Sequence, residues 1–190
     1  MLLTRLARFV YRGRKTVRRN RVNRSVESQK PYSAKAVANS LLELARKNGE
    51  NLTPMKLQKL IYFAHGWHLA FTGKPLLNEQ VEAWQWGPVI PSVYHSLKQF
   101  GPGPIEGLCM DELGNAPVVA AEDQDTQHIL SEVWRVYGHL TAMQVSNLSH
   151  QEHGPWDLAN KGNQFQSKSW PIQNETIRDH YKSLLEKRKG

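Results

Sequence analysis

The feature that most constrains the fold is a stretch near residue 60 that is apolar on almost every side of a helix. Thr53 is a good helix cap, Pro54 suits the first helical position because its missing N–H costs nothing there, and Gly73 ends the segment. A surface helix confines its apolar residues to one stripe, so a helix without a polar face has to be surrounded by other helices. We therefore expect this helix at the centre of the core. Its apolar residues are Leu57, Leu60, Ile61, Phe63, Ala64, Trp67, Leu69 and Phe71.

Shorter amphipathic segments predict the surrounding helices, because their apolar residues recur at helical spacing. Ser33 is a good cap for the first of these helices, and Thr141 with Gln144 forms a capping-box pattern for a short one. The expected helices are residues 33 to 48, a segment that begins at Pro91, residues 122 to 138, the short segment after Thr141, and a final segment around Tyr181.

Extended structure is expected in fewer places. Residues 81 to 86 are too short and too aromatic for a helix and favour a strand, which Gly87-Pro88 should end in a turn. Residues 108 to 121 form a Gly- and Pro-rich loop, with a small hairpin around Gly114-Asn115 as the alternative. After Gly154-Pro155, a polar stretch connects to the final helix. The predicted fold class is mainly α: a single compact multi-helix domain with a small β element, strand or hairpin.

The charge of the chain is concentrated at its N-terminus. Residues 1 to 31 hold ten Lys or Arg and one acid, whereas residues 32 to 190 hold fifteen bases and sixteen acids. We therefore divide the chain into a basic arm, residues 1 to 31, either disordered or a short amphipathic helix, and one domain, residues 32 to 190. The arm suits nucleic acid, an anionic membrane surface or an acidic partner. Its candidate polyanion-binding residues are Arg12, Arg14, Lys15, Arg18, Arg19 and Arg21.

Other properties narrow the class of protein. The longest apolar stretch near the middle, residues 60 to 64, is far too short to span a bilayer, so no transmembrane segment is expected. The single cysteine, Cys109, cannot form an intramolecular disulfide, which fits a reducing cytoplasm. These properties favour a cytoplasmic globular protein.

The sequence offers little for catalysis. His65 with His68, and His150 with His153, are pairs at three-residue spacing, but the first pair has no acid or cysteine at ligand spacing. We expect His65 and His68 to bond a carbonyl or to face solvent. Neither a Gly-x-Ser-x-Gly elbow nor a phosphate-binding glycine loop occurs. We expect no catalytic residue, no metal and no cofactor.

Aromatic residues beside chain breakpoints are better candidates for function. Tryptophan and tyrosine are enriched at binding hot spots, although tryptophan also fills cores. The turn around Trp86 is expected to be accessible to a partner because loops run over the surface. We place a partner surface on residues 84 to 94, with His150 and Trp156 as a possible second patch.

Six short motifs follow one another in a distinctive order. They are His65-Gly66-Trp67, Glu82-Ala83-Trp84, Gly87-Pro88, Ser92-Val93-Tyr94, Leu148-Ser149-His150 and Pro155-Trp156. Together they resemble the Panacea antitoxin domain, the SocA-like family of phage-associated and toxin-antitoxin proteins, over roughly residues 33 to 185. The resemblance makes a binding protein more plausible than an enzyme.

The resemblance implies an antitoxin that binds and neutralises a cognate toxin protein. Some members of the family look like adaptors that deliver the toxin to an ATP-dependent protease, so such a protease is a second expected partner. On this basis the toxin-binding candidates are Trp84, Trp86, Gly87, Pro88, Tyr94, His150 and Trp156.

Two other classes of function stay open. The basic arm allows a nucleic-acid-binding or autoregulatory protein, although no helix-turn-helix or zinc pattern is visible. The second alternative is a hydrolase that uses Glu152 with His150 and His153, for which a bound metal is expected.

Overall fold

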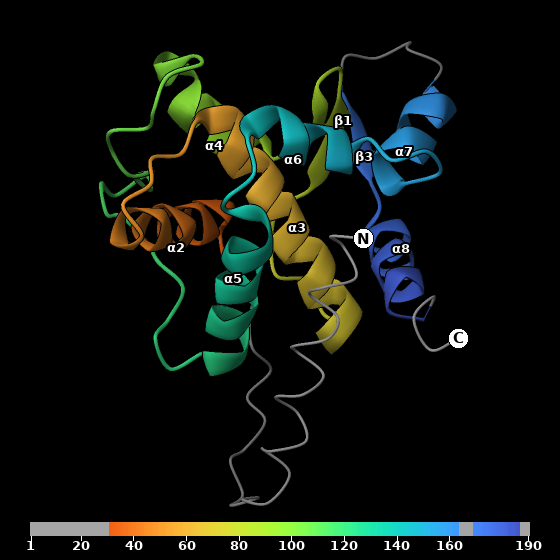
Figure 1. Cartoon of the computed structure of the whole chain (residues 1–190), viewed down its shortest axis with the longest axis horizontal. Coiled ribbons are helices and arrows are strands. Elements are labelled where there is room, and N and C mark those ends of the chain that lie inside the picture. Colours follow the sequence, from red (N-terminus) through yellow and green to blue (C-terminus); the bar gives the residue numbers. More distant parts are fainter. Residues whose placement is uncertain (1–30, 164–168, 187–190) are drawn as a thin grey trace, which may run out of the picture.

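A computed structural model describes residues 31–163 and 169–186 and shows a mainly helical fold with a small sheet (Figure 1). The predicted fold class is confirmed. The helices are α2 (Ala34–Lys47), α3 (Pro54–Thr72), α4 (Pro91–Leu97), the 3-10 turn η2 (Lys98–Phe100), α5 (Gln124–Tyr137), α6 (Ala142–Ser149), α7 (Pro155–Asn163) and α8 (Asn174–Glu186). The strands are β1 (Val81–Trp84), β2 (Gly87–Val89) and β3 (Trp170–Ile172).

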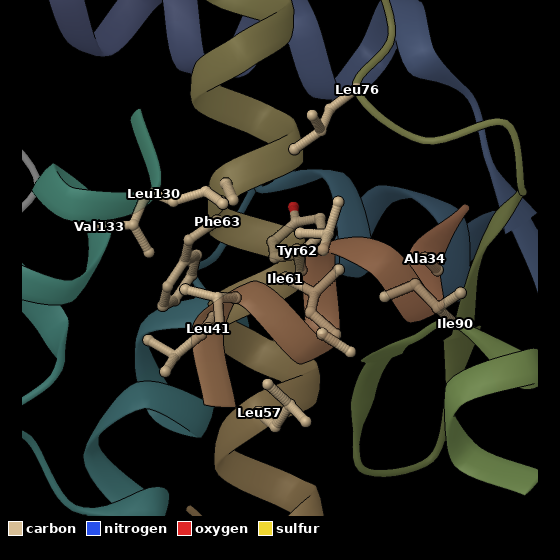
Figure 2. Packing of buried hydrophobic residues seen from close by; sticks show 14 of the residues in the cluster. Ala34, Leu41, Leu57, Ile61, Tyr62, Phe63, Leu76, Ile90, Leu130 and Val133 are labelled. Carbon is tan, nitrogen blue, oxygen red and sulfur yellow. The ribbon is translucent and has the colours of Figure 1, made fainter. Parts of the chain in front are cut away.

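Helix α3 runs through the middle of the molecule, with α2 and α5 on one side and α8 on the other (Figure 1). The Thr53 side chain caps its first turn by accepting the Lys56 N–H, and Gly73 ends it at φ 74°. Leu41 of α2 and Val133 of α5 point toward Phe63 of α3 in the core (Figure 2). The prediction that this helix is surrounded by others is confirmed.

The sheet is antiparallel, with strand order β2-β1-β3. The expected turn at Gly87-Pro88 was wrong. Residues 85 and 86 make the turn, while Gly87 pairs with Trp84 and begins β2. Pro88 is compatible with a strand here because β2 is an edge strand, where one side needs no backbone N–H.

The alternative of a hairpin within residues 108 to 121 was also wrong, since the structure has no strand in this range. The buried Asn39 side chain replaces strand pairing as the anchor of the loop. Its amide donates to the carbonyls of Cys109 and Pro117 at 2.9 and 2.8 Å and accepts the Cys109 N–H at 2.8 Å. Ser40 Oγ on the same helix also accepts the Val119 N–H at 2.9 Å, so side chains of α2 hold the loop in an irregular path.

Two elements fall in the stretch that was expected only to connect. Helix α7 follows Gly154, and β3 pairs with β1, so that Trp170 lies opposite Ala83. Neither segment has a regular apolar pattern, because α7 is short and β3 has only three residues, one of them Pro171. Their structure depends on the sheet and helix on which they pack.

Candidate functional site

Five aromatic side chains gather around the β1–β2 hairpin and form what we call the tryptophan surface. Two lie on the hairpin itself and one on α4, and two come from far along the chain, at the C-terminal cap of α6 and on α7. The members are Trp84, Trp86, Tyr94, His150 and Trp156.

The contacts join what sequence analysis treated as two patches. The rings of Trp84 and Tyr94 meet edge to face at 4.9 Å, and those of His150 and Trp156 meet at 4.2 Å. The Trp156 indole N–H donates to the Trp84 carbonyl at 2.8 Å, which links the two pairs. The tryptophan surface is therefore one connected structure.

Exposure differs strongly among the predicted toxin-binding residues. Trp86 is 72% exposed and Tyr94 is 39% exposed, so the expected accessibility of the Trp86 turn is confirmed for its aromatic side chain. Gly87 and Pro88 are buried, and their expected accessibility was wrong. They lie beneath the turn because β2 packs on α3 and α6. A partner would meet Trp86 first.

Lys59, which was not among the predicted site residues, lies on α3 under the Trp86 turn. Its Nζ donates to the carbonyls of Trp86 at 2.7 Å and Pro88 at 3.0 Å, and the residue is only 1% exposed. Burial lowers the pKa of Lys59 to about 7. The sequence does contain a signal for this burial, because a lysine on a helix that is apolar on almost every side has little access to solvent.

Gly87 lies directly against the Lys59 amino group and the His150 ring. Its φ is +100°, and a Cβ added there would lie 2.6 Å from Lys59 Nζ and 2.7 Å from His150 Cε1. His150 is oriented by its Nδ1, which donates to the Ser146 carbonyl at 2.7 Å. Burial, with a smaller contribution from the charge of Lys59, lowers the pKa of His150.

Trp170 is a further exposed aromatic at the sheet that the predicted set did not include. It lies on β3 and is 44% exposed. Its place beside β1 depends on a strand pairing that no local sequence pattern indicates.

The histidines of α3 are structural. His65 is fully buried, and its Nε2 bonds Asn174 Oδ1 at 2.8 Å while its Nδ1 accepts the Leu77 N–H at 3.4 Å. His68 Nδ1 donates to the Lys74 carbonyl at 2.8 Å, so the expected carbonyl bond is confirmed and solvent exposure was wrong. Burial lowers the pKa of His65 to about 4. Within residues 31–163 and 169–186, no three His, Cys, Asp or Glu side chains are grouped as a metal site requires.

The residues of the hydrolase alternative do not point to a common place. Glu152 and His153 lie 3.7 Å apart with side chains 79% and 78% exposed, whereas His150 turns toward Ser146 and Trp156. Cys109 is buried, and burial raises the pKa of its thiol to about 11, which disfavours the nucleophilic thiolate. The arrangement is suited to binding.

The candidate polyanion-binding residues Arg12, Arg14, Lys15, Arg18, Arg19 and Arg21 lie outside the described residues. In the part of the chain that is described, every helix is too short or too polar to cross a membrane.

Comparisons with known proteins agree on one family. Residues 57–157, just over half of the chain, match the family described as "Antitoxin SocA-like, Panacea domain". Among curated proteins, the chain is similar to Antitoxin SocA of Caulobacter vibrioides (strain NA1000 / CB15N), with 38% identity over 141 residues, covering 71% of this chain and 75% of that protein. No solved structure matches the chain. The range matched to the family contains Lys59 and the whole tryptophan surface.

Proposed function

Because the chain belongs to the SocA-like Panacea antitoxin family, we propose that it neutralises a cognate toxin protein by binding it directly. The family assignment agrees with the resemblance drawn from the six motifs. The curated relative is named an antitoxin, and a toxin is the partner that such a protein opposes.

The observation that carries this proposal is the exposed Trp86 at the tip of a fixed turn. A side chain of this size that is 72% exposed offers a large contact area. The backbone of its turn is held by the hydrogen bond from Lys59 to the Trp86 carbonyl. A rigid aromatic binds at a smaller entropic cost than a flexible one, because less freedom is lost on contact. The other members of the tryptophan surface, Trp84, Tyr94, His150 and Trp156, would complete the contact.

The mechanism is occlusion. The tryptophan surface docks on the toxin in the cytoplasm and covers its active site or effector face, and no covalent bond is made or broken. Such a mechanism needs shape and apolar contact rather than a perturbed nucleophile, which suits the exposed aromatics and the buried Cys109.

Two further partners belong to the proposal. Delivery of the bound toxin to an ATP-dependent protease would add an adaptor step to occlusion. The basic arm, residues 1–31, is proposed as a segment separate from the domain of residues 32–190, and its ten bases against one acid support contact with nucleic acid or an anionic membrane. Binding of DNA by the domain without the arm would instead favour the nucleic-acid-binding alternative.

Co-expression tests the antitoxin function. The protein encoded by the adjacent gene should be lethal when it is expressed alone and harmless when this chain is co-expressed. The Trp86→Ala variant should lose most of this rescue, whereas Leu113→Ala should keep it. Leu113 is a suitable control because it is 86% exposed and lies in the loop of residues 101–121, outside the tryptophan surface. An adjacent protein that is harmless alone would remove the main support for the proposal.

A further inference from the structure

We propose that Lys59 positions the toxin-binding turn, with its amino group taking the place of a neighbouring strand along the outer edge of β2. The inference rests on the proposed function, because it gives a reason why the Trp86 turn is displayed in one conformation. It also assigns a role to the most deeply buried lysine of the central helix.

The direction of the backbone carbonyls supports this role. Among the residues that the structure describes, strand β2 has a partner on one side only, namely β1. Backbone groups alternate in direction along a strand, so the carbonyls of residues 86 and 88 point the same way, away from β1. Both accept hydrogen bonds from Lys59 Nζ, at 2.7 and 3.0 Å. One side chain therefore provides the donors that an adjacent strand would supply.

Gly87, between these two carbonyls, supports the same assignment. At this position a Cβ would lie 2.6 Å from Lys59 Nζ and 2.7 Å from His150 Cε1, and the backbone has φ +100°, which glycine tolerates best. A side chain at residue 87 would require the Lys59 amino group or the His150 ring to move from its present place. The close packing of Lys59 and His150 against Gly87 thus fixes the position and the direction of the turn.

The amino group can donate both hydrogen bonds in either protonation state. Burial lowers the pKa of Lys59 to about 7, so the group titrates near neutral pH. A neutral amine still has two N–H donors, enough for both carbonyls. His150 is the titratable side chain that lies beside Gly87 with Lys59. Its own pKa is also lowered, mainly by burial. We therefore expect the turn to keep its structure on both sides of pH 7.

A short hairpin needs such support. Strand β3 pairs with β1 only at residues 81–83, so the end of the hairpin at the Trp86 turn has no third strand beside it, and two strands alone are marginal in water. Trp86 lies at the tip and is 72% exposed, so its own packing contributes little. Without Lys59, the turn should sample several conformations, and binding the toxin would require ordering it.

Hydrogen exchange of the full chain tests the positioning role without any toxin. Lys59→Met keeps an unbranched side chain only one atom shorter and removes both hydrogen bonds, so amides of residues 84–90 should exchange at least about tenfold faster. Lys56→Met is the matched control. Lys56 is also buried on α3 and also donates to a carbonyl, but that carbonyl belongs to Gly138. Unchanged exchange at residues 84–90 in Lys59→Met would overturn the inference.

A second pair of variants covers the case in which Lys59→Met unfolds the whole chain. Gly87→Ala and Gly114→Ala both add a Cβ at positive φ, but the added atom meets Lys59 and His150 only at residue 87 and has nothing within 4 Å at residue 114. Gly87→Ala should accelerate exchange at residues 84–90, and Gly114→Ala should not. Wild-type exchange in Gly87→Ala would contradict the proposed fit.

Toxin affinity separates this inference from the proposed function. Lys59→Met should weaken binding of the adjacent gene's product by about tenfold or more, and adding Trp86→Ala should then cost less than it does in the wild type. A pH series from 6 to 8 should leave exchange in the wild-type turn constant after correction for intrinsic rates. If Lys59→Met loosens the turn while Trp86→Ala binds toxin normally, Lys59 positions the turn but the toxin binds elsewhere.

Discussion

Two groups of aromatic residues in this protein have similar side chains and opposite surroundings. In the core, Trp67 packs edge to face on Tyr181 at 5.0 Å and donates to the Tyr137 hydroxyl at 3.2 Å. On the tryptophan surface, Trp86 has no such enclosure and is 72% exposed. Residue type therefore does not decide the role. The backbone decides it, since one tryptophan lies on a helix enclosed by others and the other lies on a two-residue turn.

Helix α3 contributes to both groups. Trp67 lies toward one end of the helix in the aromatic core, and Lys59 lies two turns earlier under the Trp86 turn. At Gly66, a Cβ would collide with the Tyr181 ring, and at Gly87 it would collide with Lys59, so each group depends on one missing side chain. The core stabilises α3, and α3 in turn holds the surface in place.

The largest effect that can break this comparison is expected from Trp67→Ala. The change removes a fully buried ring and should lower the free energy of unfolding by about 3 to 5 kcal/mol. Chemical denaturation, with circular dichroism to confirm folding, measures the loss. An unchanged melting temperature would show that Trp67 is not in the core and would remove the distinction between the two groups.

Acid should destabilise the core through His65. Its pKa falls from 6.5 to about 4 on folding, mainly because of burial. Between these values the unfolded state binds more protons, so stability is complete above pH 6.5 and is lost as the pH falls toward 4. The loss attributable to His65 is about 3 kcal/mol at most. His65→Gln should flatten this part of the stability curve, whereas the control His68→Gln should retain most of it. An equally steep curve in His65→Gln would exclude this source.

Truncation of the exposed aromatics tests whether the tryptophan surface, unlike the core group, serves binding rather than stability. Trp86→Ala or Tyr94→Ala should weaken toxin binding by about 2 kcal/mol or more, because central aromatic anchors dominate interface energies. The thermal unfolding midpoint should move little, since both side chains are exposed. Pull-down of the toxin by each folded variant measures the effect. Wild-type binding by both variants, or unfolding of both, would place these residues outside the interface.

The smallest effect on neutralisation is expected from deleting residues 1–31. The deletion removes ten bases and one acid and leaves a domain that is close to neutral. Binding to polyanions or anionic vesicles should fall, and what remains should depend little on salt. Toxin rescue should survive. Complete loss of rescue by a folded protein without the arm would show that the arm itself contacts the toxin.

Local chemistry made the helices predictable. Thr53, Gly73 and the Thr141–Gln144 capping box act within one or two helical turns, so the sequence contains the whole signal. The apolar faces of α3 also predicted its central place. Helix α7 was missed because its few apolar residues form a weak pattern, and β3 because three residues are stabilised by pairing with β1.

The candidate site was only partly predictable, for a different reason. The exposure of Trp86 could be predicted from the turn residues beside it. The contact between the two predicted patches could not, because it depends on a hydrogen bond between Trp156 and Trp84, which are 72 positions apart. Likewise, Lys59 binds carbonyls 27 and 29 positions away. Contacts at such separations are set by tertiary packing, and no short motif encodes them.

Hydrogen exchange of the wild-type protein with and without the adjacent gene's product tests the central claim most directly, because it locates the interface without any substitution. We predict that toxin binding slows exchange in residues 81–94 and 150–158, the segments that carry the tryptophan surface. Protection confined to residues 101–121, where Leu113 is 86% exposed, with unchanged exchange around Trp86, would contradict the account.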